Sequence, residues 1–81
     1  MKTHLINEAI ESLAMIEEDT TVPKNIRIRI KTTITNLQEE GDESIKIDRS
    51  LENLSEVAED PNLSSYTRMQ IWSVVSNLES M

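Results

Sequence analysis

Carboxylates are the most frequent side chains in this sequence that could do chemistry, but their spacing matches no known site. There are fifteen Asp and Glu, one His and no Cys. The single histidine, His4, lacks the second histidine of a zinc-binding helix, and the acidic run 39–43 lacks the ligand spacing of a calcium loop. One glycine is too few for Gly-rich phosphate loops or a nucleophile elbow. We therefore expect no cofactor, no metal and no enzyme, although fifteen acids still allow a catalytic carboxylate pair.

Half of the eight basic side chains fall within eight residues, and they are the best candidates for contact with an anion. They are Lys24, Arg27, Arg29 and Lys31. In a helix, Lys24, Arg27 and Lys31 share one face. However, the net charge is −7, and no aromatic platform for bases accompanies the cluster. We interpret it as a solvated or ion-paired face, with contact to an anion or RNA as the alternative.

The only aromatic residues, Tyr66 and Trp72, lie in the second half of the chain. Trp72 follows Met69 by three residues, and both lie off the main apolar stripe of their segment. Tryptophan, tyrosine and methionine are enriched at protein interfaces. This face either closes the core or meets a partner, and Tyr66, Met69 and Trp72 are the predicted interface.

A repeat of 41 residues sets the positions of these side chains. Residues 6–39 align with residues 47–80 without a gap. Nine aligned pairs are identical: Ile6/Ile47, Glu11/Glu52, Leu13/Leu54, Glu18/Glu59, Asp19/Asp60, Arg27/Arg68, Ile30/Ile71, Asn36/Asn77 and Leu37/Leu78. A repeat of about 40 residues with two helical patterns is typical of helical hairpins. We assign one domain, 1–81, with repeat one at about 4–39, a linker at 40–43 and repeat two at about 44–80.

Each repeat predicts two helices joined by a turn that contains a proline. Apolar residues recur at spacings of three and four, which is typical of an amphipathic helix. The predicted helices cover roughly 4–18, 23–39, 43–59 and 64–79. Residues 25–31 alternate like a strand, but Ile26, Ile30 and Ile34 also form a helical stripe, and the second copy is helical in pattern. We therefore predict helix there, and a left-handed glycine at Gly41 in the linker.

Both hairpin turns place charges against the helix dipole. The segment 17–19 puts acids at a helix end, and Arg27 puts a base near the next helix start. Asp19 and Arg27 recur as Asp60 and Arg68. We predict that these arginines form ion pairs with the acids of their own or the neighbouring hairpin. Such pairs are mostly modest in energy at a surface.

Three segments carry a resemblance to a known family. They are Asp19-Thr20-Thr21-Val22-Pro23-Lys24-Asn25-Ile26-Arg27; Asp60-Pro61-Asn62-Leu63 with Arg68 and Ile71-Trp72; and the ending Asn77-Leu78-Glu79. Together they resemble the small archaeal proteins of uncharacterised protein family UPF0147, over nearly the whole chain. The resemblance implies a compact four-helix protein of an archaeal cytoplasm, with no assigned activity. Ser64 departs from the second proline that is common there. More loosely, the helix, Asp-Pro turn and Arg-bearing helix are similar to HEAT-like repeats.

The predicted fold is all-α, with two helix–turn–helix hairpins packed as a four-helix bundle or a HEAT-like pair. Two repeats are too few for an open solenoid, so they close on each other or associate, and we expect a homodimer. No segment is long and apolar enough to span a membrane, and we expect a cytoplasmic location. The predicted function is a non-enzymatic protein–protein interaction or self-assembly module. The alternative is a small nucleic-acid- or ribonucleoprotein-associated factor.

Overall fold

The computed structural model describes residues 2–80, which form four α-helices. They are α1 (Lys2–Glu18), α2 (Lys24–Gln38), α3 (Glu43–Ala58) and α4 (Ser65–Glu79). The predicted all-α fold of two helical hairpins is confirmed, with every helix bound within two residues of its expected position. None of these helices is long and apolar enough to cross a lipid bilayer.

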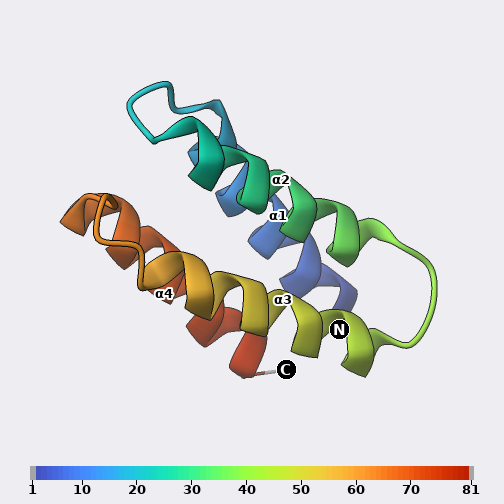
Figure 1. The fold of residues 1–81 in the computed structure, drawn as a ribbon. Helices are drawn as coiled ribbons and strands as arrows, with labels where there is room; N and C mark the ends of the chain where they lie inside the picture. Colours follow the sequence, from blue (N-terminus) through green and yellow to red (C-terminus); the bar gives the residue numbers. More distant parts are fainter. Residues whose placement is uncertain (1, 81) are drawn as a thin grey trace.

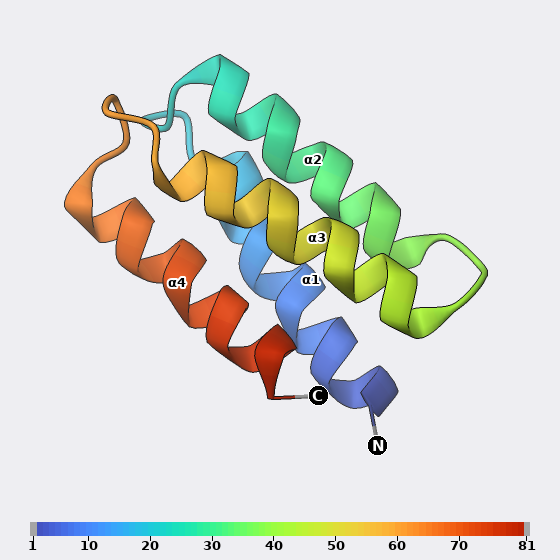
Figure 2. The same cartoon turned by 60° about the horizontal axis from the view of Figure 1, so that its bottom comes forward.

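Consecutive helices run antiparallel. Both hairpin turns therefore lie at one end of the bundle, and the linker between α2 and α3 lies at the other end, with the start of α1 and the end of α4 (Figure 1). Each helix packs against two neighbours: α1 and α3 both contact α2 and α4. Among the described residues the diagonal pairs do not approach closely. Figure 2 shows the same ring from another side.

The ring is closed by a twofold relation between the repeats. Exchanging the repeats carries the α1–α2 contact onto α3–α4, and the α2–α3 contact onto α4–α1. A translational HEAT-like stack would instead place α1 against α3 and α2 against α4, and these pairs do not meet within residues 2–80. Of the two packings that the repeat allowed, the chain adopts the four-helix bundle.

The core repeats along with the sequence. Buried positions of the first copy have buried counterparts in the second: Ala9/Ser50, Leu13/Leu54, Ile16/Val57, Val22/Leu63, Ile26/Thr67, Ile30/Ile71, Thr33/Val74, Ile34/Val75 and Leu37/Leu78. Burying a Leu, Ile or Val side chain stabilises a fold by about 1.5–3 kcal/mol. Because each copy contributes one apolar stripe per helix, two copies suffice to enclose a core.

The strand-like segment 25–31 is helical, as its stripe predicted. Ile26 and Ile30 are buried, whereas Ile28, between them in the alternation, is 55% exposed. The i, i+4 pair fills the core, and this packing outweighs the local β preference of the isoleucines. Ile28 therefore lies on the solvent-facing side of α2, beside Lys24, Arg27 and Lys31.

Side-chain caps begin α3 and α4, and a glycine with positive φ lies in the linker. The Asp42 side chain accepts a hydrogen bond from the N–H of Ile45 at 3.3 Å, which caps α3. Ser64 caps α4 by accepting from the N–H of Thr67 at 3.1 Å. Gly41 has a φ of 129°, a conformation that favours glycine. These two caps mark where α3 and α4 begin, whereas α2 begins after Pro23 without a side-chain cap.

Candidate interaction surface

The two hairpin turns share one backbone geometry. The N–H of Val22 donates to the Asp19 carbonyl at 3.1 Å, and the N–H of Leu63 donates to the Asp60 carbonyl at 3.2 Å. Val22 and Leu63 are both buried, so each turn is anchored to the core by an apolar side chain. The turns are rigid supports for the charged residues around them.

Both predicted turn arginines contact carbonyl oxygens. Arg27 donates from Nε to the Val22 carbonyl at 3.0 Å. Arg68 donates from Nε to the Ala58 carbonyl and from Nη2 to the Asp60 carbonyl, both at 2.9 Å. Ala58 is the last residue of α3, where carbonyls lack partners within the helix and carry partial negative charge. A guanidinium satisfies them directly.

This arrangement corrects the predicted ion pairs. Within the described residues, no salt bridge joins Arg27 to Asp19 or Arg68 to Asp60. Each arginine contacts its own hairpin through backbone carbonyls and not through the predicted carboxylates. An arginine near the start of a helix is therefore tolerated because it donates hydrogen bonds to carbonyls of the preceding turn or helix end.

Asp19 is held in its charged form by its own turn. The hydroxyl of Thr21 donates to Asp19 Oδ1 at 2.6 Å, and the backbone N–H of Thr21 donates to the same oxygen at 2.9 Å. These two hydrogen bonds, with a smaller contribution from the charge of Arg27, hold the pKa of Asp19 below its ordinary value of 3.8. This is a local structural role for the carboxylate.

The basic cluster of α2 is divided between two faces. Lys24, Arg27 and Lys31 line a hollow of about 180 Å³ together with Glu17 and Ile28. Arg29 points elsewhere, and its Nη2 lies 3.0 Å from Glu56 Oε2 on α3. Three of the four predicted bases thus converge, but an acid shares their hollow and the fourth base is paired. The positive field available to an anion is smaller than the sequence alone indicates.

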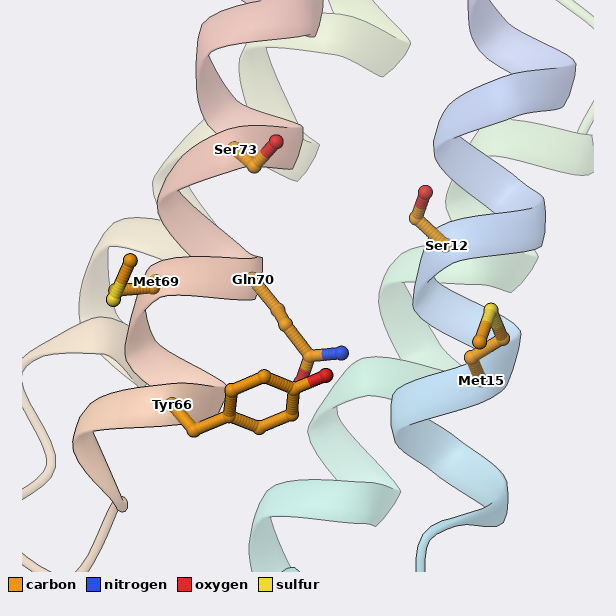
Figure 3. Close-up of a pocket in the computed structure, with 6 residues that line it drawn as sticks. All are labelled: Ser12, Met15, Tyr66, Met69, Gln70 and Ser73. Atoms are coloured by element: carbon orange, nitrogen blue, oxygen red, sulfur yellow. The ribbon is translucent and has the colours of Figure 1, made fainter.

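A second hollow lies between α1 and α4, and it has a different character. This groove holds about 320 Å³ and is lined by six residues, which Figure 3 shows: Ser12 and Met15 of α1, and Tyr66, Met69, Gln70 and Ser73 of α4. The Tyr66 ring and the Gln70 amide extend from α4 towards α1 (Figure 3). No charged side chain lines it. We call it the α1–α4 groove.

The apolar lining of this groove faces solvent. Met15 is 69%, Tyr66 69% and Met69 71% exposed. Exposed large apolar residues that gather on one surface mark interaction sites more often than isolated ones do. The predicted interface residues Tyr66 and Met69 therefore belong to the groove.

Trp72 lies outside the groove. It is 45% exposed and does not join the core. Six residues separate it from Tyr66, which turns it about 120° around α4. Arg68, one turn before Trp72, reaches α3, so this flank of α4 faces away from α1. The three residues predicted as one interface are thus divided, with Met69 between the other two.

The twofold repeat provides an equivalent pair of neighbouring helices for comparison, α2 and α3. The residues equivalent to Met15 and Gln70 are Glu56 and Arg29, and these two form the 3.0 Å ion pair. The residue equivalent to Tyr66 is Asn25. One helix pair is bridged by charges, whereas the groove of its counterpart is left apolar and open.

Sequence reasoning missed Met15 and Gln70. Both were visible in the repeat, because Met15 replaces a glutamate and Gln70 replaces an arginine of the other copy. What the alignment lacked was the knowledge that α1 and α4 are neighbours. His4 is exposed, and its Nε2 lies 3.6 Å from Oε1 of Glu8 on the same helix. Within residues 2–80, no group of three His, Cys, Asp or Glu side chains is placed to hold a metal ion.

Comparison with known proteins adds a family and a fold. The model of uncharacterised protein family UPF0147 matches residues 1–81. The crystal structure of MMP1188, a protein of unknown function, is similar with a TM-score of 0.93 and 34% identity, covering 100% of this chain and 93% of that one. A UPF0147 protein from Thermoplasma acidophilum has a TM-score of 0.90 and 32% identity, covering 96% of this chain and 93% of that one. No curated protein matches the sequence.

Proposed function

Since the chain belongs to uncharacterised protein family UPF0147, we propose a function from its own surface: it is a non-enzymatic module that binds a protein at the α1–α4 groove. The family has no assigned function, so the site must carry the argument. The observation that carries it is the difference between the two repeat-related helix pairs, α2–α3 and α1–α4. The same backbone positions hold Arg29 and Glu56 in one pair, and Gln70 and Met15 in the other.

The chain itself shows how such a helix pair can be bridged without a partner. The Arg29–Glu56 pair spans α2 and α3 with polar groups that water solvates well. The α1–α4 groove instead leaves Met15, Tyr66 and Met69 more than two-thirds exposed. Covering an exposed side chain of this size stabilises a complex by about 1.5–3 kcal/mol. Tyrosine is also among the residue types that dominate binding energy at interfaces.

The test transfers the ion pair into the open groove. The variant Met15→Glu/Gln70→Arg places the α2–α3 charges at the matched positions of α1 and α4. We expect it to fold with unchanged far-ultraviolet circular dichroism and to lose partner binding. Tagged wild-type and variant chains would be compared by quantitative mass spectrometry after capture from the source cells at low and at high salt.

The matched control makes the reciprocal change in the other helix pair. Arg29→Gln/Glu56→Met removes the ion pair and leaves the α1–α4 groove intact. A protein retained by the control and lost from the Met15→Glu/Gln70→Arg variant is the expected result. If both variants retain the same proteins as the wild type, the groove is not the binding surface.

Two other readings remain proposals with their own tests. A second copy of this chain is the other protein that could occupy the surface, as the predicted homodimer requires, and light scattering of the wild type detects it. Contact with nucleic acid is favoured only by the convergence of Lys24, Arg27 and Lys31 around one hollow. Salt-labile RNA that is captured by the wild type and lost after Lys24→Glu/Lys31→Glu would support that reading.

A further inference from the structure

We infer that the partner segment at the α1–α4 groove is an amphipathic helix with basic residues along its flanks. This inference rests on the proposed function and names the chemistry of its partner. It follows from the shape of the groove, the exposure of its lining and the charges along its rim.

The shape favours a helix over a small molecule. The groove runs between two antiparallel helices, and its lining residues recur at intervals of about one turn: Ser12 and Met15 on α1, and Tyr66, Met69, Gln70 and Ser73 on α4 (Figure 3). An added helix lies along such a furrow and inserts apolar side chains at i, i+3, i+4 and i+7. A small ligand needs most of its surface enclosed, and lining side chains that are about 70% exposed cannot enclose it.

Methionine suits this occupant. Met15 of α1 and Met69 of α4 both line the groove, and Figure 3 shows Met69 at its edge, on the side of α4 away from α1. The unbranched thioether adapts to the shape of an incoming helix and contacts its apolar side chains. An apolar face of the partner can therefore be accommodated without rearrangement of the bundle.

The rim of the groove is acidic on the α1 side. Glu8 and Glu11 lie one turn before Ser12 and Met15, and both are exposed. Glu11 also lines a separate hollow with Leu37 and Lys46, so Glu8 is the acid more closely associated with the groove. Between residues 4 and 18, α1 contains no Lys or Arg. On α4 the single base, Arg68, is committed to carbonyls on the α3 side. A partner with flanking Lys or Arg is attracted to this rim, whereas an acidic one is repelled.

The related helix pair does not share this rim. The residue equivalent to Glu8 is Arg49, so the matched edge of α3 carries one base and one acid, Arg49 and Glu52. The acidic rim therefore occurs beside the apolar groove and not beside the bridged helix pair. A second copy of this chain suits the rim poorly, because each copy has a net charge of −7.

The first probe is a synthetic helical peptide of leucine and lysine, roughly 14 residues long, with leucine at i, i+3, i+4 and i+7. A second peptide has glutamate in place of every lysine. Amide chemical shifts of the labelled wild-type protein report where each peptide binds. We expect the lysine peptide to shift amides around Ser12, Met15 and Gln70 and to leave those around Arg29 and Glu56 unchanged.

Two variants with the same change in charge separate the rim from the overall charge. Glu8→Gln/Glu11→Gln neutralises the rim, and Glu52→Gln/Glu59→Gln neutralises two exposed acids of the other repeat. We expect the rim variant to bind the lysine peptide about 2- to 30-fold more weakly, with a reduced salt dependence. The control variant should match the wild type to within about twofold.

Each outcome decides the inference. Binding of the lysine peptide at the groove, weakened by the rim variant, supports it. Equal or tighter binding of the glutamate peptide, or equal effects of the two variants, contradicts the inference that the partner is basic. If neither peptide shifts groove amides while the Met15→Glu/Gln70→Arg variant still loses a cellular protein, the helical partner is wrong and the proposed function stands. If no protein depends on the groove, the proposed function fails as well.

Discussion

Ser50 buries its hydroxyl group in the core. Its side chain is fully buried, and Ser50 Oγ has no hydrogen-bond partner among the described residues. The equivalent residue of the first copy, Ala9, is also fully buried, so an alanine fits this site of the bundle. An unsatisfied buried hydroxyl costs about 1–3 kcal/mol. The second copy therefore keeps a polar group where the first has none.

From this site we predict that Ser50→Ala raises the free energy of unfolding by about 1 kcal/mol. Urea denaturation followed by circular dichroism measures it. Thr33→Val is the control, because the buried Thr33 hydroxyl does donate, to the Arg29 carbonyl at 3.0 Å. A loss of stability in Ser50→Ala would mean that the hydroxyl has a partner in solution.

Asp19 gives a prediction for pH. Because its pKa is lower in the folded chain than its ordinary value of 3.8, the carboxylate favours the folded state above that pH. This contribution is lost as the pH falls through the lowered pKa. In Thr21→Val the hydroxyl donor is removed and the backbone donor stays, so the pKa of Asp19 should rise part of the way to its ordinary value.

Carboxyl carbon chemical shifts measured against pH report the pKa of Asp19 directly. The substitution Thr20→Val changes the neighbouring threonine, whose side chain makes no hydrogen bond with Asp19 in the described structure, and should leave that pKa in place. If Thr21→Val leaves the pKa unchanged as well, the hydroxyl is not the main cause of the shift.

At the scale of elements, basic side chains tie each connection to the helix that follows it. Arg27 and Lys46 each donate one hydrogen bond, to the carbonyls of Val22 and Glu39. Arg68 donates two, to carbonyls at the end of α3 and in the turn beyond it. The device recurs at all three connections. At the ends of α2 and α3 it satisfies carbonyls that lack partners within the helix, and in the first hairpin it satisfies the turn carbonyl of Val22.

Arg68→Ala should therefore lower the free energy of unfolding by about 1–3 kcal/mol, and Arg27→Ala by about 1 kcal/mol. Both losses should persist at high salt, because the bonds to carbonyls are partly buried and are not surface ion pairs. Thermal unfolding at low and high salt distinguishes the two cases. A loss that disappears at high salt would restore the ion pairs first predicted for these arginines.

For the whole molecule, closure of the four-helix ring means that one copy of the chain can enclose its own core. Among the described residues, seventeen apolar side chains are buried within one copy of the chain, including fully buried Leu13, Leu54 and Ile71. The argument that two repeats need a further molecule to cover their stripes therefore no longer applies, and the homodimer stays a prediction without that support. We expect the Tm to be independent of protein concentration.

Thermal scans over a hundredfold dilution, about two decades of concentration, test this expectation. Leu54→Ala serves as the reference, since a cavity in the core should lower stability by about 2–5 kcal/mol at every concentration. A wild-type Tm that falls on dilution would show that the fold is coupled to self-association, as the repeat first suggested.

The sequence by itself determined the helices, their ends and the buried positions. These depend on local order: spacings of three and four, a proline or glycine at a turn, and a cap such as Asp42. Because the two copies share one pattern, a helix indicated in one copy predicts a helix in the other, and this predicts helix for the strand-like run around Ile28. The alignment of the two copies also identifies Leu13 and Leu54, and Ile30 and Ile71, as equivalent positions.

Only the tertiary structure decided which helices are neighbours, and with them the surface. The same apolar stripes fit a stack or a ring, because periodicity fixes a face of each helix and not the element that covers it. Met15 and Gln70 are 55 residues apart, and they line one groove because α1 meets α4. Arg68 likewise binds the carbonyls of Ala58 and Asp60, which a pattern of charges along the chain does not specify.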